Sequence, residues 1–383
     1  MPMARTSASM AGSWRCREAI GVGLIRFLLA MTVVVDHYGG VLGYQMGSGS
    51  VAVEAFFIIS GFYMALVLED RYAGRLKLFY TNRYLRLFPS YFAILLLTLI
   101  VGIATGAHSR FTLPMDELGA VFMAGDFWTK AYIVVSNLGI VLLDAALFLS
   151  FDGESLSLAT DFTESAVPVY QFLLIPQGWS LGLEIYFYAL APFLLVKGWR
   201  VAAGLALSLG VFIALSMTAL PSDPWTHRFF PSILFMFLSG SLSWKLLRHK
   251  LDAPWMKKLG MGLLILTVAV ILALNASPFD EEVTRFLLLA LIAISVGPVF
   301  ALVKDNRYDR ALGDLSYPIY VAHLLAFIIA GEIYAEGQAL LGTVLTILIS
   351  LALVYAIERP LDRYRHARLK RRKDTKADEV ASS

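Results

Sequence analysis

The chain contains a regular series of apolar segments, each about the length of a membrane-spanning helix. A helix needs about 20 mostly apolar residues to cross the hydrocarbon core of a bilayer. Ten such segments are centred on residues 20–38, 51–68, 88–106, 178–196, 202–220, 229–247, 259–275, 284–303, 315–331 and 338–357. Only 16% of the residues are charged, against about 25% in ordinary soluble domains. We therefore predict an all-α polytopic integral membrane protein with about ten transmembrane helices.

Basic residues gather in alternate loops between these segments. Lys and Arg in short loops mark the cytoplasmic side of a membrane protein. They cluster in five regions, at 69–87, 197–200, 245–258, 304–310 and 359–372. Of the alternate loops, "GGVLGYQMGSGS" has no charge, and "NASPFDEE" and "GEIYAEG" carry only acids. The alternation predicts that both termini are cytoplasmic, and no small-residue cleavage site follows the first apolar run, so we expect this span to be retained.

Two terminal segments flank the predicted membrane domain. Residues 1–18 form a polar cytoplasmic N-terminal segment, and 363–383 form a basic cytoplasmic tail. Lys and Arg next to a span attract anionic headgroups, so we expect the tail to bind membrane lipid. Between them, 107–177 reads as one long outer segment, because both flanks of its apolar stretch at 132–150 are poor in Lys and Arg. We expect this stretch to be one re-entrant or interfacial piece that does not cross.

The first span, "RFLLAMTVVVDH", places Arg26 and His37 within apolar sequence. An ionisable residue inside a span indicates a functional site by default. Eleven residues separate the two, so on a helix they share one face about 16 Å apart. Asp36, next to His37, points away from it and is not the expected orienting carboxylate. The simpler alternative is that Arg26 extends to the inner surface while His37 ends the helix at the outer one.

Further polar residues lie within the other spans. Glu184 and His323 are each several residues inside a span and need polar partners. Arg83 and Arg86 are i,i+3 neighbours at the inner end of the third span. Guanidinium groups bind phosphate through paired hydrogen bonds, so this pair fits a phosphorylated ligand. Histidine suits proton transfer near neutral pH, which makes His37 a candidate general base near the outer face.

These residues occur in motifs that resemble those of the membrane-bound acyltransferase 3 family. Arg26 and His37 match its Arg, ten residues, His signature in the first span. The segments "FFIISGFYMA", "RYLRLFPSYF", "WSLGLEIYFY" and "LSYPIYVAH" resemble four further family motifs in the same order, and Glu358 with Pro360 resembles its final E-x-P. The resemblance covers 20–362, so we expect one acyltransferase 3 transmembrane domain at 19–362.

The resemblance implies a bacterial inner-membrane enzyme that transfers an acyl group, usually acetyl, from cytoplasmic acyl-CoA. The acceptor it implies is a hydroxyl of a carbohydrate or lipid-linked glycan. It implies catalytic roles for His37, Arg26 and Glu184. Residues implied to contact the acetyl-CoA donor are Arg83, Arg86, Tyr317 and His323. We expect no metal and no nucleic acid, and the single cysteine, Cys16, excludes a cysteine-rich metal site.

Several alternatives remain open at this level. In the expected mechanism His37 deprotonates a hydroxyl or first takes the acyl group itself. Glu184 is expected to orient His37, and Arg26 or Tyr317 to stabilise the oxyanion. A proton-coupled transporter is the rival, because such carriers also place His, Glu and Arg within spans. The chain shows no repeated halves, which counts against a transporter, and a membrane scaffold would leave Glu184 and Arg26 unexplained.

Overall fold

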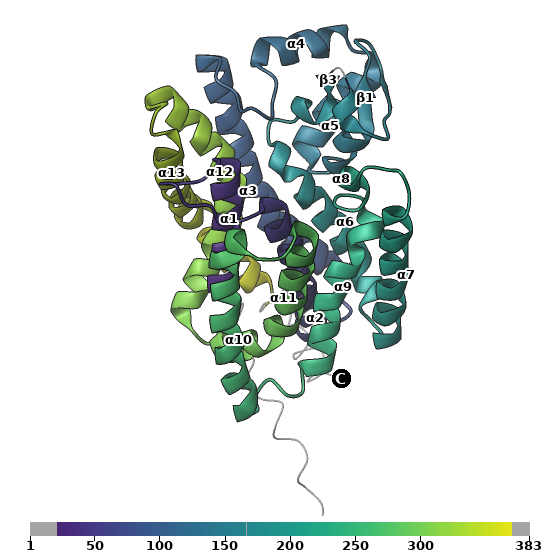
Figure 1. The fold of residues 1–383 in the computed structure, drawn as a ribbon, viewed down its shortest axis with the longest axis vertical. Helices are drawn as coiled ribbons and strands as arrows, with labels where there is room; N and C mark the ends of the chain where they lie inside the picture. The colour runs from purple at the N-terminus through teal and green to yellow at the C-terminus, as the bar shows by residue number, and fades with distance from the viewer. Residues whose placement is uncertain (1–20, 166, 370–383) are drawn as a thin grey trace, which may run out of the picture.

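The computed structural model describes residues 21–165 and 167–369, which form a bundle of long helices (Figure 1). Ten of these helices coincide with the predicted spans: α1 (Gly23–His37), α2 (Gly49–Asp70), α3 (Leu76–Thr105), α6 (Trp179–Leu194), α7 (Gly198–Ser216), α9 (Phe230–Leu247), α10 (Pro254–Ala273), α11 (Glu281–Val303), α12 (Arg307–Ile333) and α13 (Gln338–Leu353). Among the described residues, eight helices are long and apolar enough to cross a membrane. The other two, α1 and α6, have 15 and 16 residues. The prediction of an all-α polytopic membrane protein is confirmed.

Helix α2 lies at the centre of the bundle and α7 at its periphery. In their apolar windows 78% of α2 is buried but only 11% of α7, so α7 presents most of its surface to lipid. Small residues bring α2 and α9 into backbone contact. A Cβ atom on Gly61 would lie 1.7 Å from the carbonyl oxygen of Phe237, and one on Gly240 would lie 1.8 Å from that of Ile58. Neither glycine can be replaced without separating these helices.

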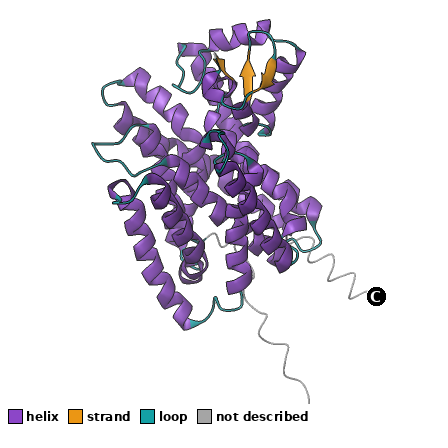
Figure 2. Ribbon diagram, turned by 45° about the vertical axis from the view of Figure 1, so that its right-hand side comes forward, coloured by secondary structure: helices purple, strands orange, loops and turns teal. Residues whose placement is uncertain are grey.

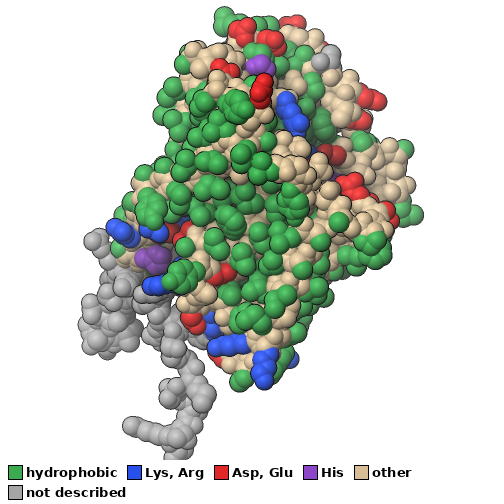
Figure 3. All heavy atoms as spheres, turned by 60° about the vertical axis from the view of Figure 1, so that its left-hand side comes forward, with side chains coloured by type: hydrophobic (Ala, Val, Ile, Leu, Met, Phe, Trp, Pro, Cys, Tyr) green, Lys and Arg blue, Asp and Glu red, His purple; other side chains and the backbone are tan. Residues whose placement is uncertain are grey.

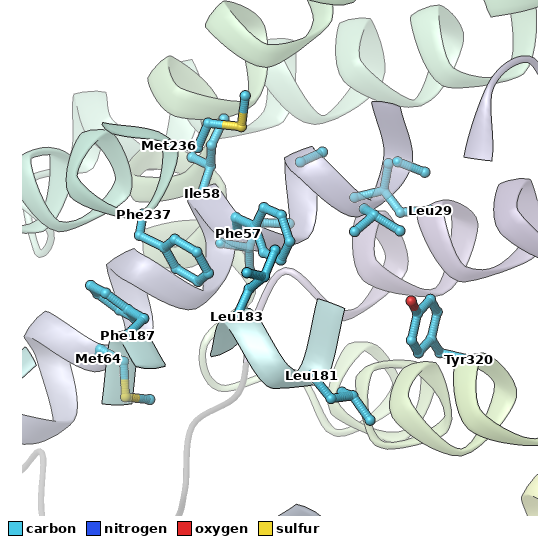
Figure 4. Close-up of a cluster of buried hydrophobic side chains, with 14 of the residues drawn as sticks. Leu29, Phe57, Ile58, Met64, Leu181, Leu183, Phe187, Met236, Phe237 and Tyr320 are labelled. Atoms are coloured by element: carbon cyan, nitrogen blue, oxygen red, sulfur yellow. The ribbon is translucent and has the colours of Figure 1, made fainter. Parts of the chain in front are cut away.

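Stacked aromatic rings join α6 to this central pair (Figure 4). The ring of Phe237 lies 4.6 Å from Phe57 of α2 and 4.4 Å from Phe187 of α6. All three rings are buried. Glu184 comes three residues before Phe187 and therefore lies one helical turn away. Packing of the aromatic cluster thus fixes the position of a carboxylate inside the bundle.

The two ends of the bundle differ in charge. Asp309, near the start of α12, accepts hydrogen bonds from the backbone nitrogens of Gly23 and Leu24 at 2.8 and 3.0 Å, so α1 and α12 begin at the same end. The loops predicted to be basic all lie at this end, which we call the basic end. Figure 3 shows most Lys and Arg side chains of that face near the basic end, below a broad apolar surface.

The opposite end is covered by residues 107–177, which we call the cap (Figure 2). The cap contains α4 (Met115–Ala124), α5 (Phe127–Gly139) and a three-stranded antiparallel sheet in the order β2-β1-β3. The strands are β1 (Leu149–Phe151), β2 (Leu156–Leu158) and β3 (Val167–Pro168), and the 3₁₀ turn Phe162–Glu164 lies between β2 and β3. As expected of a piece that does not cross, the stretch 132–150 forms no long helix, since α5 ends at Gly139 and the chain continues through the 3₁₀ turn Asp144–Phe148 into β1. The small sheet was not predicted.

The last helix is longer than its apolar sequence. It continues from α13 through a π-helical turn at Val354–Glu358 and ends at Leu369, the last described residue. The predicted boundary at residue 363 therefore falls within a helix, because amphipathic sequence continues the helix beyond the lipid-facing part. The predicted segment 1–18 and the rest of the predicted tail lie outside the described residues.

Candidate active site

Two cavities lie inside the bundle, and Val53 of α2 and Tyr320 of α12 line both. The first we call the arginine cavity, and its charged lining residues are Arg26, Arg71, Arg83, Arg86 and Glu184. The second we call the histidine cavity, and its polar lining residues include His37, Gln177 and Arg228. Arg26 is near the start of α1 and His37 is its last residue, so the arginine cavity is nearer the basic end and the histidine cavity nearer the cap.

The arginine cavity carries four guanidinium groups and one carboxylate. Arg26 and Arg83 are only 8% and 6% exposed, so water solvates their charges poorly. Nη1 of Arg26 and Nε of Arg83 have no hydrogen-bond partner among the described residues. A buried charged donor without a partner is costly, so a cavity with this lining favours an anionic ligand that supplies acceptors.

Other contacts hold the walls of the arginine cavity in place. Glu184 accepts a hydrogen bond from the Ser60 hydroxyl at 2.5 Å. The Arg83 guanidinium lies 5.9 Å from the ring centres of both Phe79 and Tyr188. The Tyr317 hydroxyl donates to the carbonyl oxygen of Leu87 at 2.6 Å. Five of the predicted residues line this one cavity: Arg26, Arg83, Arg86, Glu184 and Tyr317. The order of the motifs along the chain could not by itself show that these residues lie together.

A pair of histidines lies at the histidine cavity. Nδ1 of His323 is 2.7 Å from the carbonyl oxygen of Tyr320, which can only accept, so this nitrogen carries the hydrogen. Nε2 of a neutral His323 then holds the lone pair, and Nδ1 of His37 donates to it at 2.7 Å. Nε2 of His37 is left with the free lone pair. His37 is thereby held in the tautomer that a general base requires.

Residues of the cap form one wall of the histidine cavity. Its lining includes the cap residues Phe111, Leu143, Leu147, Phe162 and Tyr170. The ring of Phe111 lies 5.3 Å from that of His37, at an angle of 55°. Asp36, by contrast, accepts from the backbone nitrogen of Gly49 at 2.9 Å and so stabilises the start of α2. The prediction that Asp36 does not orient His37 is confirmed.

Three predicted roles are not matched by the contacts in the structure and stay predictions. Glu184 does not orient His37, because it lines the arginine cavity and bonds Ser60, while His323 holds His37. Arg26 and Tyr317 do not share a cavity with His37, and the Tyr317 hydroxyl is already bonded to a carbonyl, so neither is placed to stabilise an oxyanion there. His323 was expected to contact the donor, but its ring nitrogens contact His37 and Tyr320.

Two polar residues that line the histidine cavity were not predicted from the sequence. Arg228 lines the histidine cavity, forms a bidentate ion pair with Asp223 at 2.7 and 2.8 Å, and lies 4.4 Å from the ring centre of Trp179. Gln177 lines the same cavity. Each comes directly before an apolar span, in "PQGWSL" and "WTHRFFPS", and a polar residue at such a boundary was the available signal.

A buried ion pair joins α2 to α11, and neither of its residues lines the arginine cavity or the histidine cavity. Arg285 donates to both carboxylate oxygens of Glu54, at 2.5 and 2.7 Å, and these side chains are 2% and 1% exposed. In the described ranges 21–165 and 167–369, no group of three or more His, Cys, Asp or Glu is arranged to hold a metal ion.

The fold and the enclosed polar cavities define a multi-pass membrane protein with an intramembrane site. The model of a family described as "Acyltransferase domain" matches residues 20–359, and the chain belongs to this family. The predicted family is thus confirmed. An uncharacterized protein of Aquifex aeolicus (strain VF5) is 28% identical over 186 residues, which are 48% of this chain and 84% of that protein.

A second relative matches over most of its length. The exopolysaccharide production protein ExoZ of Rhizobium meliloti (strain 1021) is 24% identical over 343 residues, 85% of this chain and 93% of that protein. No solved structure matches this chain.

Proposed function

We propose that this membrane acyltransferase transfers an acyl group from acyl-CoA at the basic end to a hydroxyl of a carbohydrate at the cap end. The observation that carries the proposal is that Val53 and Tyr320 line both the arginine cavity and the histidine cavity, so the two cavities are neighbours. A long, thin donor with an anionic head and a reactive tip fits two such cavities in line. Acetyl is the proposed acyl group, by the resemblance to the acyltransferase 3 family.

The donor's phosphates belong at the arginine cavity. CoA carries several phosphates, and the four guanidinium groups outnumber the carboxylate of Glu184. Arg83 and Arg86 bind phosphate through charge-assisted hydrogen bonds. The apolar lining, which includes Phe57, Met64 and Leu181, then accommodates the uncharged arm. This arm runs toward Val53 and Tyr320 and carries the thioester into the histidine cavity.

His37 is the proposed general base. Its Nε2 lone pair takes the proton of the acceptor hydroxyl as that oxygen bonds to the thioester carbonyl carbon. The bond between carbon and sulfur then breaks, and the proton passes from His37 to the CoA sulfur. The products are an ester and free CoA. Because Nδ1–H of His37 donates to His323, the second histidine stabilises the imidazolium that forms between these steps.

Direct transfer is the simpler route through this site. His37 lines the cavity that lies under the cap, so base and acceptor share one space. An acyl-histidine intermediate would use the same Nε2 as a nucleophile. Rapid quenching of the enzyme with radiolabelled acetyl-CoA and no acceptor tests this, because only the second route leaves label on the protein.

The orientation and the acceptor complete the proposal. The concentration of Lys and Arg loops at the basic end supports a cytoplasmic position for that end and for both termini, in a bacterial inner membrane. The name of the Rhizobium meliloti relative refers to exopolysaccharide production, which supports a cell-surface or secreted carbohydrate or a lipid-linked glycan as the acceptor. Exposed apolar side chains along the spans make membrane lipid the surrounding partner.

Calorimetric titration with acetyl-CoA tests the donor site. The purified protein in nanodiscs should bind acetyl-CoA, and Arg83→Ala/Arg86→Ala should bind it at least about tenfold more weakly, since hydrogen bonds to charged groups contribute about 1.5–3 kcal/mol each. Lys197→Ala/Arg200→Ala is the matched control, because it removes two positive charges from the same end outside both cavities. Equal losses in both variants would contradict a specific site. No binding by folded wild type would favour the transporter.

A further inference from the structure

Gln177 has an unusual position at the start of α6. It lies in the 3₁₀ turn Pro176–Gly178, directly before Trp179, and is 5% exposed. Its Nε2 donates to the carbonyl oxygen of Val321 at 2.9 Å, and its own backbone carbonyl accepts from the Tyr320 hydroxyl at 2.5 Å. The side-chain amide and the backbone carbonyl of Gln177 are therefore both hydrogen-bonded to α12.

The orientation of this amide follows from its partner. Val321 offers a carbonyl oxygen, which only accepts, so the amide nitrogen of Gln177 must face it. Turning the amide over would bring two oxygens together. Oε1 of Gln177 is thus directed elsewhere, and it has no hydrogen-bond partner among the described residues. A buried amide oxygen without a donor is costly unless a ligand or a water supplies one.

The same helix orients both Gln177 and the histidine pair. His323 bonds the carbonyl of Tyr320, and Gln177 bonds the carbonyl of the next residue, Val321. Gln177 and His37 line one cavity. Consecutive carbonyls of α12 therefore orient two groups. One is the pair His323–His37, which contains the proposed base, and the other is the amide of Gln177, whose oxygen can accept a hydrogen bond.

We propose that Oε1 of Gln177 accepts a hydrogen bond from a second hydroxyl of the acceptor, and so selects a diol over a simple alcohol. This inference rests on the proposed function and specifies its substrate class. The acceptor unit in the histidine cavity carries a free hydroxyl on the carbon next to the one that is acylated.

Two small alcohols with the same ring test the proposal. The nanodisc enzyme is assayed with radiolabelled acetyl-CoA and either cis-1,2-cyclohexanediol or cyclohexanol, and kcat/KM is compared. Wild type should favour the diol about tenfold beyond the statistical factor of about two for its two hydroxyls, since a site with an unpaired buried acceptor discriminates against a ligand that lacks the donor. Gln177→Met, which has a similar length and no acceptor oxygen, should lose this preference, measured as the ratio of kcat/KM for the diol to kcat/KM for cyclohexanol within the same variant.

A conservative variant separates the acceptor oxygen from the anchor. Gln177→Glu loses the donor to Val321 but keeps an oxygen directed at the cavity, so it should retain a diol preference that Gln177→Met loses. Equal rates for diol and alcohol in wild type, or a diol preference that persists in Gln177→Met, would overturn the proposal. So would the absence of transfer to either alcohol while hydrolysis of acetyl-CoA still depends on His37. The absence of both hydrolysis and transfer in wild type would instead contradict the proposed function.

Discussion

His37 and His323 are 286 residues apart in sequence, yet Nδ1 of one lies 2.7 Å from Nε2 of the other. Their rings are nearly parallel, with centres 4.9 Å apart. The pair joins the end of α1 to the middle of α12. Because Tyr320 fixes the tautomer of His323, the chain of hydrogen bonds ends at a single free lone pair on His37. The arrangement supplies a base and its orienting group without a carboxylate.

Removal of His37 and removal of His323 should lower the rate of acyl transfer to different extents. We expect His37→Ala to abolish transfer, and His323→Ala to lower kcat about 100-fold, because the base remains but loses its tautomer and support. His323→Gln can still offer an amide oxygen to His37 and should recover part of that loss. Release of free CoA thiol in the presence of acceptor measures each rate.

Donor affinity is the control for this series. Neither histidine lines the arginine cavity, so the Kd for acetyl-CoA should change less than about threefold in all three variants. Persistent transfer by His37→Ala would exclude it as the base. Equal rates for His323→Ala and wild type would show that the second histidine only fills space.

Buried arginines in this chain should respond to substitution in opposite ways. Arg26 shares its cavity with three other arginines and only one carboxylate, Glu184, so Arg26→Met reduces the excess of buried positive charge and should raise the apparent Tm without donor, by about 2 °C or more. The same variant should lose the stabilisation that acetyl-CoA gives to wild type. Arg26 would thus be retained for binding at a cost in stability.

The ion pair of Glu54 with Arg285 provides the contrast. Glu54→Gln removes the buried carboxylate that pairs with Arg285 and leaves only Glu282, whose side chain is 59% exposed. Breaking a buried pair typically costs about 3–5 kcal/mol, so the apparent Tm should fall by several degrees. Donor affinity should not change, because neither residue lines the arginine cavity. Thermal unfolding with and without acetyl-CoA distinguishes the cases. A lower donor-free Tm for Arg26→Met would show that its charge is already compensated in the fold.

Much of the fold could be predicted from the sequence because lipid imposes a simple rule. Backbone groups inside a bilayer must be paired within the segment, so each apolar run of sufficient length becomes a helix. The boundaries of α2, α9 and α11 agree with the predicted spans within a few residues for this reason. The strands of the cap lie in sequence without such a constraint, and their pairing depends on contacts that no short pattern records.

The site was predicted as a list of residues and not as an arrangement. Motifs identified Glu184 and His323 because charged and polar groups within spans are rare. The partners of these residues depend on which helices pack together, and α1 packs against α12, so His37 meets His323 and not Glu184. Gln177 was missed because a single polar residue before a span is a weak signal, and its hydrogen bonds to α12 cannot be read from the sequence.

Asp144 in the cap should make stability depend on pH. It is 8% exposed and accepts from the Tyr186 hydroxyl at 2.9 Å, and burial raises its pKa from 3.8 to about 6. The folded state therefore binds the proton more tightly than the unfolded state between about pH 4 and 6. Stability contributed by this group is fully present below about pH 4 and is lost as the pH rises through about 6.

Asp144→Asn removes this titration and should unfold at a higher temperature than wild type at pH 7, with the difference vanishing near pH 4. Asp161→Asn is the control of opposite sign, because hydrogen bonds from Thr163 lower the pKa of that exposed carboxyl. Apparent Tm values for the three proteins across pH 4–7 check the effect. A constant difference between Asp144→Asn and wild type would mean that Asp144 does not titrate in this range.

Val53 should control passage between the two cavities. It is 5% exposed and, with Tyr320, lines both, so in the proposed mechanism the thioester passes beside it to reach His37. Val53→Phe adds volume at this point and should reduce transfer at least about 100-fold while acetyl-CoA still binds, since the proposed phosphate contacts are at Arg83 and Arg86. Overpacking costs about 1–3 kcal/mol, so the apparent Tm must be measured beside the rate. Val53→Ala widens the same point and should raise the rate with butyryl-CoA relative to acetyl-CoA. If Val53→Phe transferred at the wild-type rate, the thioester would not pass between these cavities, and the in-line arrangement of donor and base would be wrong.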